Sequence, residues 1–106
     1  PMIGQHHQFH HYNPGKSDFG EERYFKITKR IYGELDARLK DSKFLAGPDY
    51  TIADIATWPW MARHEWHDIG LKNYENLSRW YLDISKREAV VKGYSFIDKD
   101  AEIPQL

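Results

Sequence analysis

Histidines are the side chains of this sequence best suited to chemistry, and four of the six stand near its start. His6 and His10 are four residues apart, as are His7 and His11, so a helix would place each pair on one face. Imidazoles at this spacing can hold a metal ion, and they can equally well line a pocket or support the fold. Because no acidic or thiolate ligand lies close by in the sequence, we expect the second role and no metal site.

A second group, His64-Glu65-Trp66-His67, contains the residue types of a zinc-protease motif. That motif needs two residues between the glutamate and the second histidine, whereas here Trp66 alone separates them. The chain also has no cysteine, which excludes disulfides, thiolate metal sites and a protein thiol as nucleophile. Any thiol chemistry must therefore use a thiol that a substrate brings.

The clearest structural signal is the stretch that begins at Thr51. Thr51 is followed three residues later by Asp54, just ahead of an apolar run, which is the spacing of a capping box at a helix N-terminus. Asp54 could be taken for a buried catalytic acid, but the cap accounts for it. The run that follows is apolar on almost every side, which predicts a buried central helix, kinked by Pro59 and closed at Gly70.

Three tryptophans on or near this helix, Trp58, Trp60 and Trp66, allow two interpretations. Aromatic residues at helical spacing commonly fill a core, and they can also line a pocket for an aromatic ligand.

Helices are predicted on both sides of the central one. Residues 1–12 read as the last turns of a helix, residues 19–40 as a long helix capped by Asp18 or Ser17, and residues 76–86 as a helix capped by Asn76. Nothing in the sequence alternates as a strand does. We therefore predict an all-α fold, with one helical bundle over residues 1–94 and an irregular tail over residues 95–106.

The composition indicates a single domain without a polyanionic partner. The 106 residues carry a net charge of −1, and there is no basic stripe of the kind that binds nucleic acid. There is also no run of 18 apolar residues and no signal-peptide pattern. We expect a cytoplasmic protein that binds neither nucleic acid nor a membrane.

Several short motifs together resemble a known family. They are Phe44-Leu45-Ala46-Gly47, Tyr50-Thr51-Ile52-Ala53-Asp54-Ile55-Ala56, Trp58-Pro59-Trp60, Asn76-Leu77 and Trp80. In combination they are similar to the C-terminal helical domain of cytosolic glutathione transferases. More narrowly, Gly4-Gln5-His6-His7, Glu22-Arg23-Tyr24 and Ile69-Gly70-Leu71 resemble the bacterial nu-class, Ure2-like subgroup of disulfide-bond reductases.

The resemblance implies an enzyme whose catalytic half is not in this sequence. Members of the family have an N-terminal thioredoxin-like domain, absent here, which holds most of the glutathione site and activates the glutathione sulfur. Their helical domain supplies part of the second-substrate pocket and of the dimer interface. We therefore expect glutathione and a small electrophile or a disulfide as substrates of an intact two-domain homodimer. We expect no catalytic residue in this chain, and little or no activity of the chain alone.

Arg23 is the one binding residue that the resemblance suggests. It matches a position that contacts glutathione in the nu-class relatives, and a guanidinium suits carboxylates, of which glutathione has two. Alternatively, Arg23 is only a solvated residue in the first turn of a helix. A different class of function also stays open, in which the chain is a non-catalytic helical module for binding or assembly.

Overall fold

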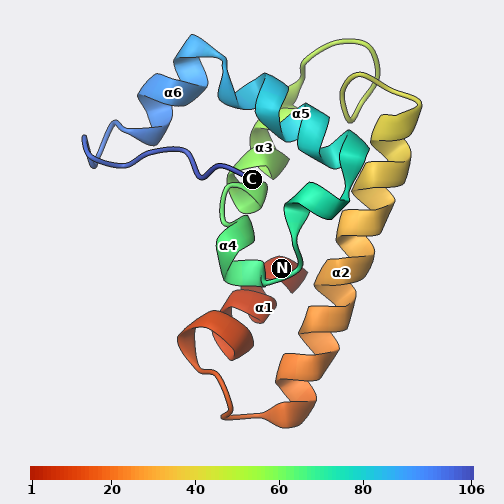
Figure 1. Ribbon diagram of the computed structural model, residues 1–106, viewed down its shortest axis with the longest axis vertical. Helices are drawn as coiled ribbons and strands as arrows, with labels where there is room; N and C mark the ends of the chain where they lie inside the picture. Colours follow the sequence, from red (N-terminus) through yellow and green to blue (C-terminus); the bar gives the residue numbers. More distant parts are fainter.

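The longest element is helix α2 (Asp18–Lys40), which runs nearly the whole length of the molecule (Figure 1). The computed structural model describes all of residues 1–106. Helix α2 begins at Ser17, whose hydroxyl accepts a hydrogen bond from the Gly20 amide at 3.1 Å. Asp18 and Glu21 place negative charge in the first turn, where the helix dipole favours it. The predicted long helix is confirmed, with Ser17 as its cap.

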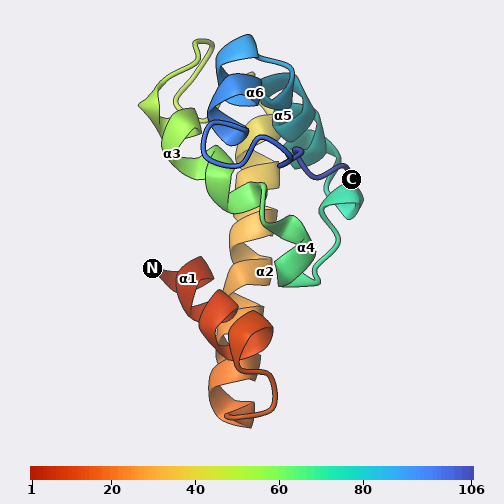
Figure 2. The same cartoon turned by 90° about the vertical axis from the view of Figure 1, so that its left-hand side faces the viewer.

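Helix α1 (Met2–His6) continues without a break into the π-helix η1 (His7–Tyr12), as the sequence predicted for a helix over this segment. Both lie along the N-terminal half of α2 (Figures 1 and 2). Gly20 of α2 allows the close approach, since a Cβ there would stand 2.8 Å from the ring of Phe9. The wider π turn changes which side chains share a face, so the predicted four-residue pairing of the histidines holds only in part.

Helix α3 (Ile52–Met61) starts with the predicted capping box. The Thr51 hydroxyl accepts from the Ala53 amide at 3.3 Å, and the Asp54 carboxylate accepts from the Thr51 amide at 3.0 Å. Its predicted end at Gly70 is wrong, because the helix stops at Met61 and a short helix α4 (His64–His67) follows. Past Pro59 the chain tightens into a turn, and a left-handed residue, Asp68 (φ 54°), closes α4.

The prediction that α3 is buried on nearly all sides is also wrong. Trp58 and Met61 lie in the core, but Ile52 is 82% exposed and Ile55 is 53% exposed. An apolar face of α3 therefore has no covering element within this chain.

After the 3₁₀ turn η2 (Leu71–Asn73), helix α5 (Glu75–Ser85) places Leu77, Trp80, Tyr81 and Ile84 in the core, as the sequence predicted. Its predicted cap, Asn76, is wrong. The first turn of α5 is capped from α2, because the Asp36 carboxylate accepts from the amides of Asn76 and Leu77, each at 2.9 Å. A cap from a distant helix leaves no local signal in the sequence.

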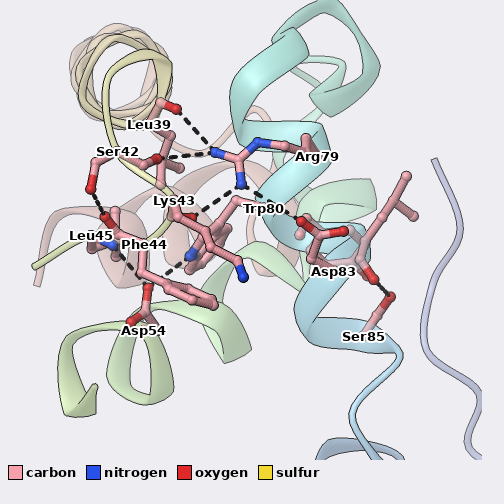
Figure 3. A network of polar contacts seen from close by, with 12 residues as sticks. Leu39, Ser42, Lys43, Phe44, Leu45, Asp54, Arg79, Trp80, Asp83 and Ser85 are labelled. Atoms are coloured by element: carbon pink, nitrogen blue, oxygen red, sulfur yellow. Dashed lines mark hydrogen bonds and ion pairs between the residues drawn. The ribbon is translucent and has the colours of Figure 1, made fainter. Parts of the chain in front are cut away.

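Helix α5 caps α2 in return. The Arg79 guanidinium donates to the carbonyls of Leu39, Ser42 and Lys43 at 3.0 to 3.2 Å, where α2 ends and the next loop begins (Figure 3). Arg79 also pairs with Asp83 at 3.6 Å. The two helices thus satisfy polar backbone groups that each would otherwise leave unpaired.

Asp54 joins a third element to this network. Its side chain is completely buried and accepts from the Leu45 amide at 3.0 Å and from the Trp80 indole at 2.8 Å, in addition to the cap of α3 (Figure 3). One carboxylate therefore ties the 44–46 segment, α3 and α5 together. This structural use agrees with the sequence prediction and extends it.

Helix α6 (Glu88–Tyr94) follows α5, and residues 95–106 are irregular. The tail returns over the bundle, where the Tyr81 hydroxyl donates to the Pro104 carbonyl at 2.6 Å. The predicted all-α fold is confirmed, since the chain contains helices and no strand. None of these helices combines the length and the apolar character needed to cross a bilayer.

Candidate functional site

Four histidines, His6, His7, His10 and His67, meet where α1 and η1 contact α2 and α4, and we call this cluster the histidine joint. His67 of α4 is its centre and is fully buried. Its Nδ1 lies 2.5 Å from the Tyr32 hydroxyl, and its Nε2 lies 2.7 Å from Nε2 of His7. Its backbone carbonyl accepts from Nε2 of His6 at 2.9 Å. The side chain and backbone carbonyl of His67 thus connect α4 to three other helices, α1, η1 and α2.

The centre of the joint is uncharged. Burial, with a smaller contribution from the neighbouring histidines, lowers the pKa of His67 to about 3. Burial also lowers the pKa of His6 and of His7, and it raises the pKa of Tyr32. At neutral pH these side chains therefore interact as neutral hydrogen-bonding groups.

Most ring nitrogens of the histidine joint already lie within hydrogen-bond distance of protein atoms. His6 and His10 do share a face, with rings stacked 4.9 Å apart, but His11 stacks instead on Trp66 at 4.1 Å. Both nitrogens of His67 are already within hydrogen-bond distance of protein atoms. No group of three or more histidine, aspartate or glutamate side chains has an arrangement that could hold a metal ion.

His10 differs from its neighbours because both of its ring nitrogens face carboxylates. Its Nδ1 lies 3.0 Å from Glu21 of α2, and its Nε2 lies 2.7 Å from Asp68, just beyond α4. Burial opposes the charge, but hydrogen bonds with Asp68 and Glu21 outweigh it and raise the pKa of His10. No sequence spacing could have revealed this clamp, because the three residues come from separate segments.

Beside the joint lies an aromatic surface, formed by Trp60, Trp66, His11 and Tyr12. Trp60 is 42% exposed and Tyr12 is 60% exposed, and the Arg63 guanidinium lies 4.8 Å from the Trp66 ring centre. Trp58, by contrast, belongs to the core, where its indole donates to the Tyr81 carbonyl at 3.1 Å. The core interpretation is thus confirmed for Trp58, whereas for Trp60 and Trp66 the ligand-pocket interpretation stays a prediction.

Arg23 lies in the first turns of α2, on the other side of η1. Its side chain is exposed and makes no hydrogen bond or ion pair, whereas the adjacent Glu22 pairs with Lys26 at 2.8 Å. The guanidinium lies 5.8 Å from the ring of Tyr24, which stacks on Phe9 of η1 at 5.6 Å. Arg23 is thus connected to η1 through the rings of Tyr24 and Phe9.

A separate cavity of about 860 Å³ lies among α3, α6 and the tail. Its lining is mostly apolar, with Trp58, Tyr94 and Ile97 among the larger side chains, and Arg63 and Asp98 as its charged ones. Because α6 and the N-terminal end of α2 lie at opposite ends of the molecule (Figure 1), Arg23 and this cavity do not form one site.

Comparison with known proteins gives a consistent result. Residues 11–88 match the family described as "Glutathione S-transferase, C-terminal domain". The chain is 40% identical over 89 residues to the disulfide-bond oxidoreductase YfcG of Escherichia coli K12, covering 84% of this chain and 41% of that protein. It is 36% identical over 94 residues to the disulfide-bond oxidoreductase YghU of the same organism, covering 80% of this chain and 32% of that protein.

A third relative, an uncharacterized GST-like protein of Streptococcus mutans, is 34% identical over 90 residues, which cover 77% of this chain and 34% of that protein. The chain therefore spans between about a third and two fifths of the length of these curated relatives. The family match covers most of the helical bundle described above, from η1 to the start of α6. This chain belongs to the glutathione S-transferase family, and it corresponds to the C-terminal helical domain of that family.

Proposed function

We propose that this chain is the helical domain of a cytoplasmic, glutathione-dependent disulfide-bond oxidoreductase, active as a two-domain homodimer. The observation that carries the proposal is its similarity, at 40% and 36% identity, to two proteins named disulfide-bond oxidoreductases. The chain has no cysteine, so every reacting thiol would come from glutathione or from the second substrate. Catalysis then belongs to a domain outside this sequence, and the isolated chain is inactive.

In this proposal Arg23 binds one carboxylate of glutathione. Its guanidinium is exposed and makes no hydrogen bond or ion pair, so binding an anion would break neither. The fork of donors on a guanidinium can bind a carboxylate through two parallel hydrogen bonds. Arg30, further along the same helix, is a matched control because it is equally exposed and is already paired with Glu34 at 3.6 Å.

The test is Arg23→Ala beside Arg30→Ala in the full-length enzyme. We expect Arg23→Ala to raise KM for glutathione about tenfold, with a much smaller change in kcat, because one charge-assisted hydrogen-bonded contact is lost. Arg30→Ala should leave both constants unchanged. Equal constants for the two variants would mean that Arg23 is only a solvated side chain.

The aromatic surface is the part of the domain that we assign to the second substrate, a small electrophile or a disulfide. The exposed ring of Trp60 offers flat apolar contact near the half-buried Trp66, and Arg63 beside Trp66 adds a charge for a polar substituent. The dimer interface is proposed on family grounds alone.

A second candidate function is a non-catalytic helical module for binding or assembly. It is favoured by the exposed apolar face of α3, which could receive another protein segment. Intact mass of the protein in its source cells separates the two. A mass about twice 12.6 kDa supports the enzyme, whereas a native mass of 12.6 kDa without thiol-transfer turnover supports the module.

A further inference from the structure

His10 is the one histidine here whose two ring nitrogens both face carboxylates. Nδ1 lies 3.0 Å from Oε1 of Glu21, and Nε2 lies 2.7 Å from Oδ2 of Asp68. Because an ionised carboxylate only accepts hydrogen bonds, both of these hydrogen bonds form together only when the His10 ring is a doubly protonated imidazolium. Neutral His10 could keep only one of the two hydrogen bonds.

The two carboxylates belong to segments that are far apart in the sequence. Glu21 lies in the first turn of α2 and also accepts from the Gly15 amide at 3.1 Å, which fixes the loop between η1 and α2. Asp68 is the left-handed residue that ends α4. A single charge on His10 therefore holds η1 to the start of α2 and to the end of α4.

Other charged or titratable groups face His10 from every neighbouring element. Asp18, Glu22 and Lys26 of α2 line the hollow beside it, His6 of α1 stacks on its ring at 4.9 Å, and His67 of α4 lies behind His6. Three carboxylates other than Asp68 thus stand on the α2 side, opposed by one lysine. This surplus of negative charge favours the charged form of His10.

We propose that the histidine joint is a pH-responsive latch, which holds residues 2–12 on the bundle when His10 is charged and His6, His7 and His67 are neutral. The charged ring clamps the outer edge of the joint, and the neutral rings form its buried hydrogen-bond chain. Loss of either condition releases the same short helical segment. The inference does not depend on glutathione binding.

The direction of the response follows from the two kinds of histidine. The pKa of His10 is raised above 6.5 in the fold, so its stabilisation is complete below about pH 6.5 and is lost as pH rises through the folded value. The pKa values of His6, His7 and His67 are lowered, so their stabilisation is complete above pH 6.5 and is lost as pH falls. The latch is therefore tightest near pH 6.5.

Two measurements on the whole chain test the alkaline side of the latch. The ¹³C chemical shifts of the histidine rings, followed between pH 5 and 9, give the titration of His10 directly. Amide hydrogen exchange, corrected for intrinsic rates, gives the opening equilibrium of residues 7–12. We expect His10 to titrate above pH 6.5 and the opening constant to rise about threefold or more between pH 6.5 and 8.5, while α5 shows no such change.

Matched variants identify the residue responsible. His10→Gln should remove the alkaline response of residues 7–12, whereas His11→Gln should keep it, because His11 contacts no carboxylate. In the double variant Glu21→Gln with Asp68→Asn, His10 should titrate at a lower pH. Two results on the wild-type chain would overturn the proposal. One is a His10 that titrates at or below pH 6.5, and the other is an opening constant of residues 7–12 that does not change with pH.

Discussion

Asp54 shows how one residue can carry more of a fold than its local motif suggests. As the N3 residue of a capping box it would be worth about 1 kcal/mol. Here it also accepts from the Leu45 amide and the Trp80 indole, and both donors would be left buried and unpaired without it. Burial alone would raise the pKa of Asp54, but hydrogen bonds from Thr51, Trp80 and Leu45 lower it below its usual value.

We therefore predict that Asp54→Asn lowers the free energy of unfolding by about 2 kcal/mol, since an amide cannot accept through both of its polar atoms. The carboxylate stabilises the fold above the pKa of an unfolded aspartate, and this contribution is lost as pH falls through the lower, folded value. The variant should accordingly lose less stability than wild type on acidification. Urea unfolding at pH 7 and at pH 3 measures both effects.

Asp49→Asn is the matched control, because Asp49 is exposed in the loop just before α3 and caps nothing. It should change stability by less than about 0.5 kcal/mol. Equal losses in the two variants would contradict the role given to Asp54. The sequence predicted the capping box, because that motif is local. It could not predict the hydrogen bond from Trp80, which reaches Asp54 only through the packing of α5 on α3.

At the scale of elements, α2 and α5 supply each other's missing hydrogen-bond partners. We predict that Asp36→Ala lowers the free energy of unfolding by about 1 to 2 kcal/mol, because two amides at the N-terminus of α5 lose their acceptor. Asn76→Ala should be nearly neutral, since the Asn76 side chain makes only a 3.5 Å contact with Asp36. Thermal unfolding of both variants measures the two effects. A larger loss of stability in Asn76→Ala than in Asp36→Ala would mean that Asn76 is the cap of α5 after all.

The same contrast explains which elements the sequence could predict. The length of α2 and the buried face of α5 follow from periodicity and from a local cap at Ser17, so both were predicted correctly. The cap at Asp36 depends on a contact with another helix, and the end of α3 at Met61 depends on a local turn past Pro59 that the apolar pattern does not reveal. The histidine joint is the extreme case, because its partners come from four segments and its geometry depends on a π turn.

For the molecule as a whole, the solvent-accessible surface is larger than expected for a monomer of this mass. The accessible area is 7005 Å², whereas a monomer of 12.6 kDa is expected to expose about 6,200 Å². Only 19 of 106 residues are buried, and the apolar face of α3 is part of the excess. The domain thus has apolar surface that suits a partner.

We predict that the isolated chain self-associates with rising concentration, because this face has nothing in the chain to cover it. Replacing both Ile52 and Ile55 by Ser should weaken the association, whereas Val91→Ser on α6 should not. Sedimentation equilibrium at several concentrations measures the outcome. A chain that stays monomeric at every concentration would contradict the prediction and show that the exposed face of α3 does not drive association.

The chain of Tyr32, His67 and His7 has one more consequence. His67 is neutral and carries one ring proton, so its two links must run in the same sense. Either the Tyr32 hydroxyl donates toward His67 and His67 donates toward His7, or both hydrogen bonds point the other way. The chain therefore has two possible polarities, which have the same net charge and differ in the direction of both hydrogen bonds at once. The orientation of a hydroxyl in the core thus determines whether the remaining nitrogen of His7 donates or accepts.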